Sequence, residues 1–253
     1  MTWRSKRQLS VIGIALTPIV LVLLWISYGA LFPNPSCFDN KKNQQEQEVD
    51  CGGPCGPCEL KHPKNIVAFW ARALPIRENI YDLVAYIQNP NEALSSANVE
   101  YQFTFLDRNG IIGTKSGSTF MYAQEKVHII EPNIQAARVP TAIDFEVKRA
   151  DWQFRQDPQP NILIEKKDFR ITGDTGQKAT EVETSLLNRA PFPFKEVEVR
   201  FILSDTEGNV RATNRVLVEN LASGEHRTVK SLWPTEITGV ETIEIEPRVN
   251  IFN

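Results

Sequence analysis

The sequence predicts an all-β protein that follows one N-terminal transmembrane helix and a short cysteine-rich segment. Three observations lead to this prediction. An uncharged run occupies residues 9–32, all four cysteines lie between residues 37 and 58, and apolar and polar residues alternate in much of the remaining chain. A chain of 253 residues has room for one large domain or two small ones behind such a beginning.

Composition excludes one class of function. Hydrophobic residues make up 42% of the chain and charged residues 23%, which is ordinary for a protein with a buried core. The formal net charge is −3, and the charges are spread without long acidic or basic runs. Proteins that bind nucleic acids normally carry a basic face. We therefore expect no nucleic-acid partner.

The first element is the run from Leu9 to Phe32, which contains no charged residue and no histidine. About 20 helical residues cross the hydrocarbon core of a membrane, so this run is long enough to span it. Pro18 is compatible with this reading, because membrane helices tolerate proline. A cleaved signal peptide has a shorter apolar region and small residues at its cleavage site, whereas Pro33 and Pro35 follow here. The prediction is an uncleaved single-pass anchor.

The orientation follows from the charges beside the anchor. Arg4, Lys6 and Arg7 precede the apolar run, and no positive charge occurs from Leu31 to Asn40. The positive-inside rule then leaves residues 1–8 in the cytoplasm and carries the rest of the chain across the membrane.

The second element is the cysteine-rich segment at 33–60, which holds Cys37, Cys51, Cys55 and Cys58. On the outer side of the membrane disulfides are the expected state. Four cysteines allow three pairings, and the sequence does not choose among them. The segment is too short and polar to bury a core, so cross-links would supply its order.

Two other readings of these cysteines stay open. Four thiolates can bind zinc, and the spacing of Cys51, Cys55 and Cys58 also occurs where radical enzymes bind an iron–sulfur cluster. Alternatively, Cys55 and Cys58 could act as a thiol–disulfide oxidoreductase pair. That chemistry needs a thiolate activated by positive charge or a helix N-terminus, and Glu59 follows directly instead.

The segment also resembles a short module of secreted and surface-anchored bacterial proteins, with the pattern C-x-D/N-G-x-x-N-x-x-E-x-x-V-D-C-G-G-x-C-x-x-C. The matching residues are Cys37, Asp39, Asn43, Glu46, Val49, Asp50, Cys51, Gly52, Gly53, Cys55 and Cys58. Asn40 stands where the pattern often has glycine. The resemblance implies a spacer or attachment element beside β-rich domains. Separately, the oxygen atoms of Asp39, Asn43, Glu46 and Asp50 are ligands of the kind that calcium takes.

The remaining chain contains an internal repeat. The pattern from Val99 to Gly110 returns from Val197 to Gly208, with each matched pair 98 residues apart. In both copies a strand with alternating apolar residues ends in an aspartate and a turn glycine, which predicts a hairpin. Asn89 corresponds to Asn188, although the separation of these two residues differs by one from the offset of 98. Downstream, 145–147 matches 243–245 at the offset of 98.

The length of each copy predicts two tandem sandwiches. Roughly 95 residues suffice for about seven short strands in an immunoglobulin-like β-sandwich. We expect the first sandwich at 61–155 and the second at 161–253. Prolines at 158 and 160 predict a stiff linker at 156–160.

The repeat resembles FxLYD-type and late-embryogenesis-abundant-like β domains. The residues that carry this likeness are Asn188, Val197, Phe201, Asp205, Gly208, Gly224 and Glu225, together with their counterparts in the first copy. The resemblance implies extracytoplasmic modules without catalytic residues. Gln124 stands where the second copy has Gly224, so we expect a looser turn in the first copy.

The sequence offers few candidates for a catalytic or binding site. The chain has three histidines, His62, His128 and His226, and nothing in the sequence places an acid, a base and a nucleophile together. We assign no catalytic residue, no cofactor and no metal. Aromatic residues could form a binding face. The candidates are Phe69, Trp70, Trp152, Phe192, Phe194 and Trp233, of which we expect Phe192 and Phe194 to be exposed and the others to lie in the core.

The expected function is therefore a non-catalytic envelope protein. Its sandwiches would be displayed outside the cell membrane to bind or scaffold another envelope protein or a glycan. The alternatives are an extracytoplasmic thiol–disulfide oxidoreductase that uses Cys55 and Cys58, and a surface module stabilised by calcium or another metal.

Overall fold

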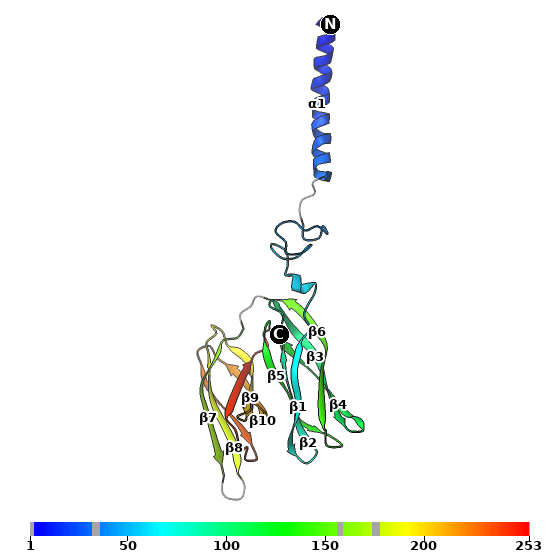
Figure 1. Ribbon diagram of the computed structural model, residues 1–253. Helices are drawn as coiled ribbons and strands as arrows, with labels where there is room; N and C mark the ends of the chain where they lie inside the picture. The colour runs from blue at the N-terminus through cyan, green and yellow to red at the C-terminus, as the bar shows by residue number, and fades with distance from the viewer. Residues whose placement is uncertain (1–2, 32–35, 156–158, 174–177, 253) are drawn as a thin grey trace. The chain divides into compact units, whose positions relative to one another are not determined.

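The computed structural model describes residues 3–31, 36–155, 159–173 and 178–252. The chain forms two compact units, Met1–Cys58 and Glu59–Asn253. The first holds one helix and the cysteine-rich segment, and the second is built from strands (Figure 1). Residues 156–158 of the predicted linker lie outside the described residues.

The first unit begins with helix α1, which spans Trp3–Leu31 and contains Pro18. It covers most of the run predicted at 9–32. The Thr17 hydroxyl donates a hydrogen bond to the Gly13 carbonyl at 2.8 Å, one turn back along the helix. In the part of the chain whose side chains the structure describes, no helix satisfies both the length and the hydropathy of a membrane span. The membrane-spanning role of 9–32 stays a prediction. A short 3₁₀ helix, η1 (Cys58–Leu60), forms the end of the cysteine-rich segment.

The first half of the second unit is a β-sandwich of two three-stranded sheets. Its strands are β1 (Val67–Arg77), β2 (Ile80–Gln88), β3 (Leu94–Asp107), β4 (Gly110–Met121), β5 (Lys126–Gln135) and β6 (Ala142–Phe154). One sheet has the order β1-β2-β5 and the other β4-β3-β6. Apolar side chains of both sheets form a shared core, in which Leu83, Phe103 and Ile129 are almost completely buried.

The second half repeats this arrangement. Its strands are β7 (Ile162–Thr172), β8 (Ala179–Asn188), β9 (Phe194–Ser204), β10 (Val210–Leu221), β11 (His226–Trp233) and β12 (Thr242–Arg248). The sheets are β11-β8-β7 and β10-β9-β12, with a core of their own around Leu186, Phe201 and Leu221. Each half therefore has six described strands rather than the seven or so expected. Strands of 7 to 14 residues use up the available length.

The structure confirms the repeated strand and hairpin. In β3 the alternate residues Val99 and Phe103 are buried, and Val197 and Phe201 are buried at the matching positions of β9. The following turns join β3 to β4 and β9 to β10. Gly110 has a φ of 116° and Gly208 a φ of 78°, in the left-handed region that glycine enters without steric cost.

A second turn is also repeated, and our expectation that it is looser in the first copy was wrong. Gln124 adopts a φ of 58° and Gly224 a φ of 72°. In both turns the glutamate that follows accepts a hydrogen bond at 2.8 Å from a backbone N–H three residues earlier. The same hydrogen bonds hold both turns, so Gln124 adopts the conformation that its neighbours impose.

The two sandwiches contact each other through a small apolar cluster. Leu74, Val84 and Ile130 of the first sandwich pack with Ile202 and Val210 of the second, and all five are buried. These residues lie on the outer faces of the β1-β2-β5 and β10-β9-β12 sheets. This apolar contact positions the polar residues around it.

Candidate functional site

The cysteine-rich segment contains two disulfides, which resolves the open choice among three pairings. Cys37 is bonded to Cys55, and Cys51 to Cys58. Cys55 and Cys58 are therefore not bonded to each other. A redox-active pair would form a disulfide between these two cysteines. All four thiols are oxidised, so neither cysteine-containing group with metal-ligand spacing has a thiolate to offer a metal.

The carboxylates of the segment serve the loop itself. Asp50 Oδ1 accepts hydrogen bonds from the backbone N–H groups of Asp39 and Asn40, at 3.0 and 3.1 Å. Glu46 Oε2 accepts from the N–H groups of Asn43 and Asp50, each at 3.1 Å. These oxygens replace the secondary structure that the segment lacks.

The geometry does not favour the calcium reading. Within the part of the chain that the structure describes, the carboxylates of Asp39, Glu46 and Asp50 do not form a group with metal-ligand spacing. The pKa of Asp39 is lowered chiefly by the hydrogen bond that its carboxylate accepts from the Asn43 amide. The Asn43 Oδ1 atom is buried without a partner and is the one unsatisfied acceptor in this set.

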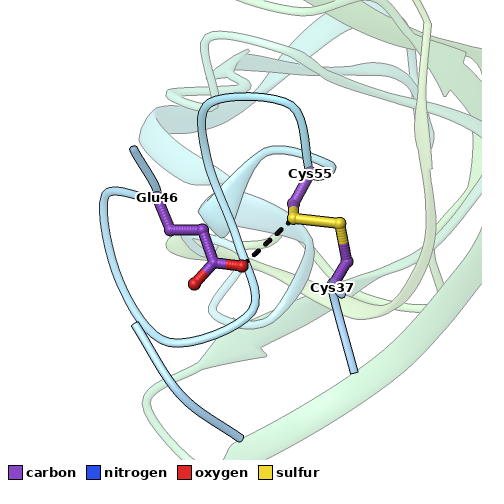
Figure 2. Close-up of side chains that lie close together, drawn as sticks. All are labelled: Cys37, Glu46 and Cys55. Carbon is purple, nitrogen blue, oxygen red and sulfur yellow. Dashed lines mark hydrogen bonds between the residues drawn. A yellow bond between two sulfur atoms is a disulfide. The ribbon is translucent and has the colours of Figure 1, made fainter. Parts of the chain in front are cut away.

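Glu46 also contacts a disulfide directly. Figure 2 shows its carboxylate pointing at the bond between Cys37 and Cys55, with Oε1 3.2 Å from the Cys55 sulfur. A disulfide sulfur carries no hydrogen, so this is a van der Waals contact in the oxidised protein. After reduction the same carboxylate would accept a hydrogen bond from the thiol and disfavour the thiolate. The arrangement is thus unsuited to a reactive cysteine.

A row of aromatic rings crosses the outer face of the first sandwich. Trp70 on β1 pairs with Tyr86 on β2, which pairs with His128 on β5. Tyr86 stacks on His128, with ring centroids 4.4 Å apart. Phe69 is the extra residue of a β-bulge after Ala68, and its ring lies 5.3 Å from that of Tyr86.

The bulge explains one wrong prediction. Phe69 was expected in the core, but it is 48% exposed because the bulge takes it out of the strand alternation. Trp70 and Trp152 are half-buried, and Trp233 is buried as expected.

The two aromatic residues near the start of β9, Phe192 and Phe194, differ in their exposure. Phe192 is exposed, as predicted. Phe194 was expected to be exposed and is buried instead, because it is the first residue of β9 and pairs with Leu221. The two rings meet edge to face, with centroids 5.6 Å apart.

Charged residues surround the apolar contact between the sandwiches. Arg248 on β12 donates to both carboxylate oxygens of Glu125 at 3.0 Å, and to the Phe120 carbonyl at 2.7 Å. Its side chain is 3% exposed and lies over the Phe120 ring. Burial lowers the pKa of Arg248 from its usual value, and the positive charge of Arg200 adds to this effect.

A second buried arginine holds His128 in place. Arg200 on β9 donates hydrogen bonds to the His128 carbonyl and to the Glu198 carboxylate. Glu246 Oε1 lies 2.7 Å from His128 Nδ1, and Glu246 Oε2 accepts the His128 backbone N–H at 3.2 Å. Glu244, two residues earlier on β12, has its carboxylate within 4.8 Å of the same ligand atoms.

The other two histidines occupy different surroundings. His226 lies 98 residues after His128, and its Nδ1 is 2.7 Å from Glu165 Oε2 on the exposed surface of the second sandwich. His62 is exposed. Sequence reasoning singled out the histidines but missed Glu244 and Glu246. Their alternation with Ile243 and Ile245 was a signal, although such a pattern usually marks a solvated strand face.

No protein-family model matches the chain, and no curated protein is significantly similar to it in sequence. Two solved structures show weak likeness. Red sea bream transglutaminase is 11% identical over 75% of this chain, which spans 32% of that enzyme, with a TM-score of 0.23. An N-terminal tandem of CBM22 domains from Paenibacillus barcinonensis is 7% identical over 74% of this chain and 86% of its own length, with a TM-score of 0.17. Similarity at this level carries no argument about fold or function.

Proposed function

We propose that this protein is a non-catalytic, membrane-anchored envelope protein that displays two immunoglobulin-like sandwiches as a rigid platform for another envelope protein or a glycan. The observation that carries the proposal is the buried, ion-paired contact between the sandwiches. Arg200 and Arg248 each bridge both halves with hydrogen bonds. Such a contact fixes the orientation of two modules, which a binding or scaffolding surface requires.

The strand order supports the immunoglobulin-like assignment. If β1 to β6 correspond to strands A, B, C, C′, E and F, the sheets β1-β2-β5 and β4-β3-β6 are the A-B-E and C′-C-F layers of that fold. The second sandwich follows the same order. The last strand of the usual fold has no counterpart among the described strands, which fits the count of six in each copy.

The location is supported by the anchor sequence and the disulfides. The uncharged run at 9–32 follows a basic start, and α1 is helical over Trp3–Leu31. Two disulfides directly after such a run suit an oxidising compartment. A reporter fused after Asn253 tests the topology, because activity confined to the cytoplasm would contradict it.

The disulfide pairing makes the oxidoreductase alternative less favourable. The pairing joins Cys55 to Cys37 rather than to Cys58, and Glu46 opposes formation of a Cys55 thiolate. Alkylation of the purified full-length chain before and after mild reduction tests this. We expect no alkylation before reduction and slow opening after it; one pair that opens at once in mild reductant would favour redox chemistry.

Phe69, the exposed member of the aromatic row, marks the surface that we expect to contact the partner. A photo-crosslinking amino acid at Phe69, incorporated in the native cells, should yield discrete crosslinked products. The matched control is Val139, which is also an exposed apolar residue, at 65%, but lies in the loop after β5. Identical products from both positions, or none from Phe69, would contradict a binding role for this face.

A further inference from the structure

We propose that His128, Glu244 and Glu246 form a binding site for one divalent transition-metal ion, with Zn²⁺ as the probe ion. The site would join the two sandwiches, because His128 lies on β5 and both glutamates lie on β12. One ligand atom from each residue, Nδ1 of His128 and a carboxylate oxygen of each glutamate, lies within 4.8 Å of the others. This inference goes beyond the proposed function and does not depend on it.

The donor set suits a borderline metal ion. Imidazole nitrogen and carboxylate oxygen bind Zn²⁺ at about 2.0–2.2 Å, so ligands of a tetrahedral ion lie roughly 3–3.5 Å apart. The gap of 2.7 Å between His128 Nδ1 and Glu246 Oε1 is bridged by one proton in the metal-free protein. For a metal ion to bind Nδ1 of the neutral ring, that proton moves to Nε2, and the gap needs to open only slightly.

The charges around the site leave room for a cation. Glu244 and Glu246 are two residues apart on one strand, so both side chains leave the same face of β12. Glu246 faces Arg200 in the strand register, yet the guanidinium of Arg200 bonds to Glu198 and to the His128 carbonyl. Among the described residues, the side chain of Glu244 forms no hydrogen bond or ion pair. Two carboxylates thus share one imidazole.

The ligands are also held before any metal arrives. The His128 side chain is 6% exposed and stacks on Tyr86, which fixes the plane of the ring. Burial, followed by the charges of Glu244 and Glu246, raises the pKa of Tyr86, so the negative field of the two carboxylates reaches that ring. Glu244 is exposed, which gives the ion an entry path and a position for a water ligand.

The chain contains its own control for this site. His226, on the first residue of β11 in the second copy, has its Nδ1 at the same 2.7 Å from Glu165. That pair does not belong to a group of three possible ligands within the described residues. A histidine–glutamate pair by itself would therefore bind metal at both places, whereas the proposed site needs Glu244.

The test uses the full-length chain, stripped of metal with a chelator and dialysed to equilibrium against Zn²⁺. We expect one bound Zn²⁺ per wild-type chain and at least tenfold weaker binding by the Glu244→Gln variant. The Glu165→Gln variant should bind as wild type does. Wild-type protein without Zn²⁺, a Glu244→Gln variant with wild-type affinity, or a Glu165→Gln variant without binding would each overturn the proposal.

A second measurement separates ligation from folding. Because the Glu244 side chain is exposed and forms no hydrogen bond or ion pair among the described residues, the metal-free Glu244→Gln and Glu244→Ala variants should unfold at the wild-type temperature. Added Zn²⁺ should raise the unfolding temperature of wild-type and Glu165→Gln protein by several degrees, since a ligand that binds only the folded state stabilises it. An equal rise in both Glu244 variants would overturn the proposal.

Discussion

At the scale of single residues, the two copies share one buried asparagine that organises a turn. Asn89 Nδ2 donates to the carbonyls of Leu94 and Tyr122, at 2.7 and 2.8 Å. Asn188 Nδ2 donates to the carbonyls of Phe192 and Leu221 in the same way. Both side chains are completely buried. Each joins the start of its third strand to the end of its fourth.

Replacing either asparagine should therefore be costly. The Asn89→Ala and Asn188→Ala variants each leave two carbonyls without donors, at least one of them buried, so we expect each to lose about 2–4 kcal/mol of unfolding free energy. Urea denaturation followed by tryptophan fluorescence measures the loss. Asn98→Ala is the control, because Asn98 bonds only to Glu100 through its side chain at the surface. A loss below that of the control would contradict the role of these asparagines.

The sequence identified these residues only in part. Asn89 and Asn188 were matched as repeat partners, one residue out of step, but their burial was not predicted. A pattern can mark an asparagine as a turn residue. It cannot show which carbonyls will surround the amide, since one of the two in each copy comes from the end of a strand 33 residues away.

At the scale of elements, the cysteine-rich segment is stabilised by two disulfides, each of which closes a short loop. The Cys37–Cys55 disulfide has a sequence separation of 18, and Cys51–Cys58 a separation of 7. In the loop-entropy description these cross-links stabilise the segment by about 3 and about 2 kcal/mol. Among the described residues of the segment, no cluster of buried apolar side chains forms a core.

Removal of the Cys37–Cys55 disulfide, which closes the longer loop, should consequently loosen this segment and leave the sandwiches unchanged. In a Cys37→Ser, Cys55→Ser double variant we expect proteolysis between residues 37 and 58 at least tenfold faster than in wild type. The unfolding temperature of the Glu59–Asn253 unit should stay within about 2 °C, because the two units are separate compact bodies. Limited proteolysis and calorimetry of the same samples measure both effects. A large fall in the unfolding temperature would contradict this independence.

The last strand of each sandwich shows where sequence matching reached its limit. Val147 and Ile245 are 98 residues apart and were matched as equivalent. In the structure Val147 pairs with Tyr101, whereas Ile245 pairs with Phe201, the counterpart of Phe103. A shift of two residues in the strand register leaves every side chain on the same face of the sheet. The alternation pattern therefore cannot detect such a shift.

At the scale of the whole molecule, the contact between sandwiches combines apolar packing with buried charges. Burial by itself would raise the pKa of Glu198, but the positive charges of Arg200, Arg215 and Arg248 lower it below the usual value. A carboxylate with a lowered pKa stabilises the folded state above its unfolded pKa, near 4.5. That contribution is lost as the pH falls through the folded pKa.

Acid should therefore weaken this contact. We expect the Glu198→Gln variant to be less stable than wild type at pH 7, and the difference to shrink steadily as the pH falls below about 4.5. Urea denaturation between pH 7 and pH 3 measures this. Glu146→Gln is the control, since the Glu146 side chain is 62% exposed and its pairing with Lys148 is a surface contact. A difference that is independent of pH would contradict an ionised role for Glu198.

The sequence by itself determined the β class, the repeat and its hairpins, and the position of the cysteine cluster. These properties depend on short-range patterns, in which residues a few positions apart share a face or a turn. Tertiary structure decided the disulfide pairing, the outward turn of Phe69 and the meeting of His128 with Glu246, which is 118 residues away. Such contacts depend on how distant strands pack, and the outer face of a strand has the same alternation whether water or another sandwich covers it.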